Sequence, residues 1–171
     1  MDIVIRAVEL KDAEQLKSIY SQKNVQENML QLPAPSLSYW ESRIQNYTEK
    51  GWIGFVAEIE GVVVGELVIF TQQHVRLRHV VSFGVAVDIN HSGKGIGKQL
   101  ILFCQEYAFQ WLAAKRLELE VFASNDSAIR LYENLGFEIE GKKRNAALKN
   151  GEYPGCFPYV KISHLTSGPG V

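Results

Sequence analysis

The 171-residue sequence contains few cysteines, little net charge and no long apolar run. Its two cysteines, Cys104 and Cys156, are too few for a disulfide framework, so the sequence predicts two free thiols in a reducing compartment. A formal net charge of −1 argues against the strongly basic face that nucleic-acid binding requires. No apolar run approaches the roughly 18 residues of a membrane span. We therefore expect neither a nucleic acid nor a membrane as a partner.

Signals for export and for metal binding are also lacking. Residues 1–9 carry charges at short intervals and have no apolar signal-peptide core, so the sequence predicts a soluble cytoplasmic protein. Metal-ligand spacing is absent among the four histidines, His74, His79, His91 and His164. Neither cysteine lies in a recognisable nucleophile motif. The sequence thus predicts no metal site and no covalent acyl-enzyme.

Hydrophobic residues make up 46% of the chain, which suits one domain with a sizeable core. Apolar periodicity predicts strands at 3–8, 52–59, 62–71, 75–87, 117–121, 137–139 and 153–162, a helix from residue 11, and helices at 36–50, 96–111 and 125–135. This order predicts an α+β domain with one mixed, mostly antiparallel sheet of about seven strands flanked by about four helices. The domain is expected to span 1–163, with 164–171 as a flexible tail.

Single residues predict where several of these elements begin, end or become irregular. Ser36 follows a break with two prolines and is a candidate N-cap for the second helix. Gly84 interrupts a strand and indicates either a β-bulge or a close backbone approach. Gly136 is expected just past the end of the last helix, and Asn150-Gly151 is a strong hairpin-turn signal.

Three alternating glycines, Gly93, Gly95 and Gly97, lie between a β-branched run and a helical pattern. Free N–H groups and the helix dipole make such a place suitable for anionic phosphates. The spacing does not fit the G-x-G-x-x-G dinucleotide fingerprint, and Gln99 after Lys98 does not fit the Walker pattern. One glycine would suffice for a turn, so three favour a backbone that approaches a ligand.

The segment Ser92–Gly97 resembles the Q/R-x-x-G-x-G/A acetyl-CoA loop of the GNAT superfamily of N-acetyltransferases. A second segment, 117–137, is similar to the strand–Asn–x–x–Ala–x–x–x–Tyr–x–x–x–Gly–Phe motif of that superfamily. The resemblance implies acetyl-CoA as co-substrate and a GNAT-like single domain. It implies coenzyme contacts from Val85, Ala86, Val87, Gly93, Lys94, Gly95, Ile96, Gly97, Lys98, Asn125 and Tyr132. Ser92 departs from the family, because Gln or Arg usually stands there.

Acetyl transfer to an amine needs a base for the amine proton and an acid for the leaving thiolate. The resemblance gives Tyr132 the acid role, although helical spacing alone would also suit a core tyrosine. Asn125 is a candidate helix N-cap as well as a coenzyme contact. Glu120 matches the base of ribosomal-protein N-acetyltransferases and is preferred to Glu118. Glu66 is a further candidate base.

The acceptor is expected to be the primary amine of a small molecule. Residues 30–36 and 149–153 are similar to bacterial L-amino-acid N-acetyltransferases, whereas 155–159 departs from their pattern. A pocket for the acceptor is expected from Tyr39, Trp40, Phe157 and Tyr159, which are also plausible core residues. The alternatives are a polyamine or protein N-terminal acetyltransferase and a non-catalytic acyl-CoA sensor. A homodimer is left open.

Overall fold

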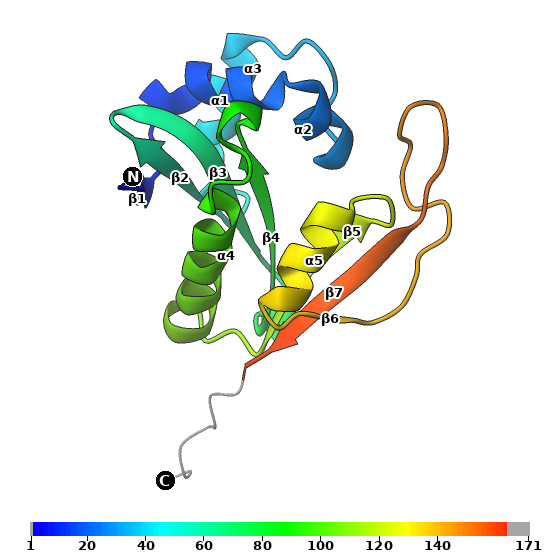
Figure 1. The fold of residues 1–171 in the computed structure, drawn as a ribbon. Coiled ribbons are helices and arrows are strands. Elements are labelled where there is room, and N and C mark those ends of the chain that lie inside the picture. The colour runs from blue at the N-terminus through cyan, green and yellow to red at the C-terminus, as the bar shows by residue number, and fades with distance from the viewer. Residues whose placement is uncertain (1, 164–171) are drawn as a thin grey trace, which may run out of the picture.

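Seven strands form one sheet in the computed structural model, which describes residues 2–163. Their order is β1-β2-β3-β4-β5-β7-β6, and every neighbouring pair is antiparallel except β4 and β5 (Figure 1). The strands are β1 Val4–Ala7, β2 Trp52–Ile59, β3 Val62–Thr71, β4 Val80–Val87, β5 Arg116–Phe122, β6 Glu138–Ile139 and β7 Cys156–Ile162. The predicted mixed, mostly antiparallel α+β sheet is therefore confirmed. The predicted tail, 164–171, lies outside the described residues.

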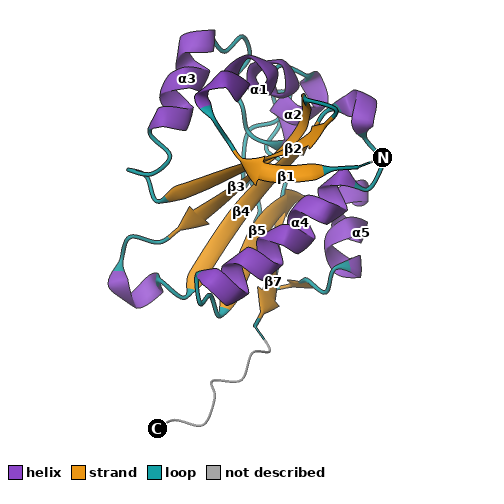
Figure 2. Cartoon of the chain, turned by 90° about the vertical axis from the view of Figure 1, so that its left-hand side faces the viewer, coloured by secondary structure: helices purple, strands orange, loops and turns teal. Residues whose placement is uncertain are grey.

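Helices cover both faces of this sheet (Figure 2). They are α1 Ala13–Tyr20, α2 Lys23–Asn28, α3 Leu37–Gln45, α4 Ile96–Glu106 and α5 Asp126–Asn134. The first three pack on one face around Leu16, Tyr20 and Trp40, whereas α4 and α5 pack on the other face around Leu100 and Leu117. The sequence did not predict α2 as a separate helix, because Val25 is its one buried residue and gives no helical period.

The predicted hairpin of β2 and β3 has the expected bounds. Its register shifts between Ala57 and Glu58, an irregularity that no residue in this part of the sequence indicated. Gly84 pairs regularly with Val68, so the alternative of a bulge at Gly84 is wrong. A Cβ added to Gly84 would lie 3.0 Å from the terminal methyl carbon of Met29, which supports the other alternative, a close approach.

Helix and strand ends were less well predicted. Ser36 caps α3 by accepting a hydrogen bond from the Tyr39 N–H, but α3 ends at Gln45 and not near residue 50. The strand expected at 75–87 begins at Val80, after a short 3₁₀ turn. Trp111 was expected in the apolar stripe of α4, yet 75% of it is exposed. The backbone widens into a π-helical turn at Tyr107–Trp111, and this turn shifts the helical period.

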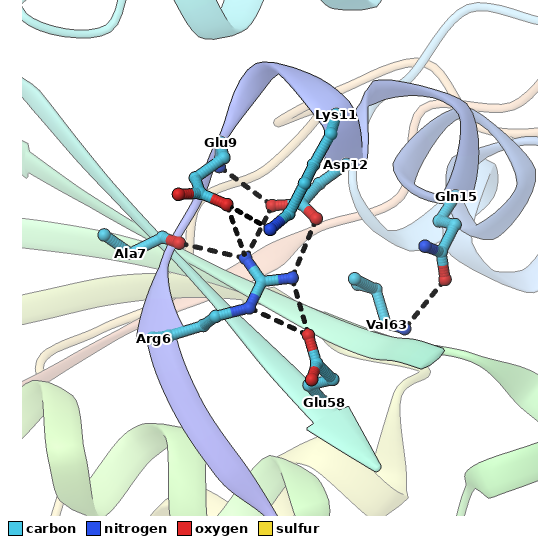
Figure 3. A network of polar contacts seen from close by, with 8 residues as sticks. All are labelled: Arg6, Ala7, Glu9, Lys11, Asp12, Gln15, Glu58 and Val63. Carbon is cyan, nitrogen blue, oxygen red and sulfur yellow. Dashed lines mark hydrogen bonds and ion pairs between the residues drawn. The ribbon is translucent and has the colours of Figure 1, made fainter. Parts of the chain in front are cut away.

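An ion-pair network fixes β1 against the start of α1 (Figure 3). The Asp12 carboxylate is 1% exposed and accepts hydrogen bonds from both terminal nitrogens of Arg6, each at 2.8 Å. It also accepts the Glu9 N–H at 2.8 Å, and Arg6 pairs with Glu58 on β2. Burial raises the pKa of Asp12, but these hydrogen bonds outweigh burial and leave the pKa below its usual value. Asp12 is therefore ionised in the folded protein.

Asp12→Asn is expected to lower the free energy of unfolding by about 2–3 kcal/mol at pH 7, because it removes a buried charge partner of Arg6. The Asp12 pKa is lower in the folded state, so wild-type stabilisation is present above the unfolded pKa and is lost as pH falls through the folded pKa. Urea unfolding at pH 7 and pH 3 measures both effects. Glu9→Gln is the control, because the Glu9 side chain is 56% exposed. An equal loss at both pH values would contradict the assignment.

Candidate active site

The parallel strands β4 and β5 separate after a short paired stretch. Pairing is confined to Val80–Ser82 of β4 and Arg116–Glu118 of β5. Beyond it, β4 continues to Val87 with its other edge paired to β3. Among the described strands, none pairs with residues 83–87 on the β5 side. This half of β4 therefore has backbone N–H and C=O groups free for a ligand.

A cavity of about 650 Å³ occupies the opening between the separated strands. α4 lies along β4 and α5 lies along β5 (Figure 1). Residues in the first turns of both helices line the cavity. Its lining includes every expected coenzyme-contact residue except Lys94, and it also includes Glu120, the preferred candidate base. These residues are Val85, Ala86, Val87, Gly93, Gly95, Ile96, Gly97, Lys98, Glu120, Asn125 and Tyr132.

The glycine loop leads into α4 through two left-handed residues. Gly93 has φ +75° and Gly95, the N-cap of α4, has φ +83°, a conformation that side-chain-bearing residues rarely adopt. No side chain caps the start of α4 among the described residues. Its first N–H groups therefore lack intrahelical partners, and the positive end of the helix dipole faces the cavity.

Two lysines, Lys94 and Lys98, supply positive charge beside the loop. Lys98 lines the cavity, whereas Lys94 is exposed and does not. His91 also lines the cavity, and its Nδ1 lies 2.6 Å from the Asp88 carboxylate. Asp88 is itself 2.6 Å from the Gln22 side-chain amide nitrogen. The sequence did not indicate His91 as a lining residue, because the short 3₁₀ turn at Ile89–His91 that places it there has no local sequence signal.

Tyr132 projects from α5, whose N-cap is Asn125 as expected. The Asn125 side-chain oxygen accepts the Ala128 N–H at 3.3 Å. The Tyr132 ring packs edge-on against Phe83 and Phe137, with centroids 6.2 and 5.8 Å away. Within residues 2–163 its hydroxyl has no hydrogen-bond partner. Burial raises the pKa of Tyr132 to about 12, so the phenol holds its proton at neutral pH.

The three candidate carboxylates have different surroundings. Glu120 is the one acidic residue among the described residues that line the cavity, and its carboxylate is ion-paired with Lys143. Glu118 does not line this cavity and pairs with Arg116. Glu66 is fully buried beneath α3, where Tyr47 donates a hydrogen bond to it at 2.8 Å. Burial raises the pKa of Glu66.

The end of the cavity away from the glycine loop has a lining that the sequence did not predict. Met29, Phe70 and Phe83 supply apolar surface there, and Arg43 of α3 supplies a cation. The predicted pocket residues are not in the lining. Trp40 and Tyr159 belong to the core, Tyr39 is 48% exposed, and Phe157 packs against the core from β7. These four residues were predicted to line the pocket because they are aromatic, but aromatic character does not distinguish a core position from a pocket position.

Residues 2–163 contain neither a metal site nor a membrane-spanning helix. No cluster of three or more His, Cys, Asp or Glu side chains is suited to hold a metal ion. None of the described helices is long and apolar enough to cross a membrane. Cys104 and Cys156 are free, as predicted, and the structure shows that both are buried. Burial raises the pKa of the Cys104 thiol beyond its usual range, so this thiol is not an activated nucleophile.

Comparison with known proteins identifies the family. Residues 16–137 match the acetyltransferase (GNAT) family. The chain belongs to this family. It is an N-acetyltransferase that uses acetyl-CoA, as the glycine loop and the Asn125–Tyr132 segment led us to expect. This GNAT enzyme also has the fold of solved acetyltransferases, which confirms the predicted architecture.

Individual relatives indicate the range of acceptors in the family. The GNAT enzyme is 39% identical to L-amino acid N-acetyltransferase AaaT of Escherichia coli over 161 residues, which is 94% of this chain and 98% of that relative. Ribosomal-protein-alanine N-acetyltransferase of Brucella melitensis superimposes with a TM-score of 0.83 at 27% identity, covering 94% and 99% of the chains. Spermidine N-acetyltransferase of Vibrio cholerae, solved with CoA and spermine, superimposes with a TM-score of 0.85 at 22% identity. The match covers 94% of this chain and 95% of that chain.

Proposed function

We propose that this enzyme transfers the acetyl group of acetyl-CoA to the primary amine of an L-amino acid or a related small molecule, by direct attack in a ternary complex. One observation carries the proposal. A single cavity has a phosphate-type loop at one end, the Tyr132 side chain in its lining and an apolar lining with one cation at the other end. The 39% identity to an L-amino-acid N-acetyltransferase over nearly the whole chain supports the same acceptor class.

The coenzyme is proposed to bind along the glycine loop and β4. N–H groups at the start of α4, together with Lys98, suit its pyrophosphate. The unpaired edge of Val85–Val87 suits the amide groups of the pantetheine arm, which can pair with it as a neighbouring strand would. Asn125 borders the same cavity. Ser92, which also lines it, is too short for the reach of an arginine, so the cationic contact is assigned to Lys98.

Tyr132 is proposed as the general acid. The amine nitrogen forms a bond to the thioester carbonyl carbon, the carbon–sulfur bond breaks, and the leaving sulfur takes the Tyr132 hydroxyl proton. The second proton lost from the nitrogen returns to the Tyr132 phenolate, directly or through water. The raised pKa of about 12 keeps that proton available at every physiological pH. The unpartnered hydroxyl and its position in the cavity lining support this role.

Glu120 is proposed to take the proton of the attacking ammonium group, directly or through water. Its place in the cavity lining distinguishes it from Glu118 and Glu66. Lys143 neutralises part of its charge, and both side chains are about half exposed, at 50% and 53%. The pair can therefore open without leaving a charge buried.

The charge of the lining favours an amino acid over a polyamine. A polyamine carries several positive charges and requires acidic groups around it. The described lining has Glu120 as its one carboxylate, already paired with Lys143, and also contains Arg43. The weaker identity to E. coli spermidine N(1)-acetyltransferase, 28% over 64% of the chain, agrees with this preference.

An acceptor screen tests the proposal. CoA release from acetyl-CoA is measured with the twenty L-amino acids, with spermidine and spermine, and with peptides that carry free N-termini. Acceptor-dependent release with amino acids, and much lower kcat/KM with polyamines and peptides, is the expected result. Release with polyamines alone, or with no acceptor at all, would overturn the proposed acceptor class or the transfer activity, respectively.

A further inference from the structure

Arg43 is a cation in the cavity whose donors are mostly unused. It extends from α3, lines the cavity beside Met29 and Phe70, and is only partly exposed. Its Nε donates to the Tyr47 hydroxyl at 3.3 Å. Within residues 2–163, its two terminal nitrogens have neither a hydrogen bond nor an ion pair. A guanidinium whose terminal N–H groups are free is a donor fork that fits a carboxylate.

The guanidinium is held in one orientation by its neighbours. Its central carbon lies 5.1 Å from the Trp40 ring centroid, 5.3 Å from that of Trp52 and 5.8 Å from that of Tyr47. Cation–π contacts of this kind favour a fixed guanidinium plane. Tyr47 in turn donates to the buried Glu66 carboxylate at 2.8 Å, so its hydroxyl oxygen is oriented to accept from Arg43. The fork is therefore ordered before any ligand arrives.

The charge of Arg43 is not neutralised by direct contact. Glu66 influences it through space, but no carboxylate oxygen of the described residues lies within ion-pair distance of its guanidinium. The one acidic lining residue, Glu120, is paired with Lys143. A partly desolvated cation without an ion-pair partner attracts an anionic group from a ligand.

We propose that Arg43 binds the α-carboxylate of the acceptor amino acid, an inference that rests on the proposed function. The carboxylate accepts from the two terminal nitrogens of Arg43, and the acceptor side chain lies against Met29, Phe70 and Phe83. Acceptors with an apolar side chain are favoured by this lining. Polyamines are disfavoured, because their charge repels the guanidinium. Tyr47 is a positioning residue for the fork.

The test compares two pairs of substrates, each an amino acid and its amide, in two enzymes. Steady-state kcat/KM is measured for L-methionine and L-methioninamide, and for L-phenylalanine and L-phenylalaninamide, in wild type and Arg43→Gln. The wild type is expected to prefer each amino acid over its amide by at least about 30-fold, and Arg43→Gln by less than about 3-fold. Since both enzymes receive the same substrates, differences in amine basicity between acid and amide cancel in this comparison.

Matched variants separate recognition from folding. Arg78→Gln removes an exposed arginine outside the cavity and is expected to keep the wild-type preference. Arg43→Lys keeps the charge without the fork and is expected to give an intermediate preference. Tm and the acetyl-CoA dissociation constant are measured for each variant and are expected to stay near wild type. If Arg43→Gln does not fold, the Arg43→Lys ratios decide in its place.

The outcomes distinguish this inference from the proposed function. Equal losses for amino acid and amide in Arg43→Gln, or an unchanged preference in Arg43→Lys when that variant decides, would overturn the role of Arg43. Wild type that acetylates amides as well as acids would also overturn it, although transfer to amines would stand. Wild type that releases no CoA with any amine would overturn the proposed function, and the inference would fall with it.

Discussion

Tyr132→Phe is expected to lower kcat by about 10²-fold or more and to leave the acetyl-CoA dissociation constant within about twofold of wild type. The substitution removes one oxygen and keeps the ring contacts with Phe83 and Phe137. That hydroxyl has no partner within the described chain, so its loss leaves no buried group unsatisfied. Stopped-time CoA release and titration with acetyl-CoA measure the two quantities.

The control for this variant is Tyr107→Phe. Tyr107 is a half-buried tyrosine that packs against the same core from the end of α4, but it does not line the cavity. Loss of the Tyr107 hydroxyl is expected to leave kcat unchanged. The pKa of about 12 adds a second expectation, that the kcat of the wild type shows no fall from Tyr132 ionisation between pH 6 and pH 10. A Tyr132→Phe enzyme with kcat within about threefold of wild type would remove Tyr132 from the acid role.

Trp40→Ala is expected to lower the free energy of unfolding by about 3–5 kcal/mol, the range for deleting a large buried ring. Trp40 is fully buried, and its ring centroid lies 4.6 Å from that of Tyr20 on α1. The ring joins α1 to α3 and also forms one wall of the aromatic site around Arg43. Urea denaturation followed by circular dichroism measures the loss.

Two variants check that the loss comes from burial. Trp40→Phe is expected to lower the free energy of unfolding by less than half as much as Trp40→Ala. The buried indole N–H has no hydrogen-bond partner among the described residues, so its removal is favourable. Trp111→Ala removes a tryptophan that is 75% exposed and is expected to change stability by less than about 0.5 kcal/mol. Similar losses for Trp40→Ala and Trp111→Ala would contradict the packing role.

Local sequence signals located the elements whose causes are local. The β2–β3 hairpin follows from β-branched alternation around Glu60-Gly61, and both residues have positive φ. Asn150-Gly151 likewise forms a turn with both residues at positive φ, flanked by an isolated bridge rather than regular strands. Ser36 and Asn125 cap the helices that follow them. These features depend on neighbours in sequence, so composition and spacing sufficed.

Elements that depend on tertiary packing were missed or misplaced. α2 is held by Val25, which is buried in the core cluster that includes α1 and α3, and not by its own periodicity. The π-helical turn at Tyr107–Trp111 exposes a tryptophan that a regular helix would bury. In both places the favourable energy comes from contacts with distant residues, which a local pattern does not contain.

The sequence by itself determined the family and the glycine-loop end of the cavity, because the residues expected there lie in two continuous segments, 85–98 and 117–132. Each segment keeps its internal spacing in any fold that forms its strand and helix. The opposite end of the cavity, where we propose that the acceptor binds, was decided by the tertiary structure. Met29, Phe70 and Arg43 come from separate elements and meet only when α2 and α3 pack over the sheet beside β3 and β4. Arg43 could therefore be assigned a role only after the fold had brought it to the cavity.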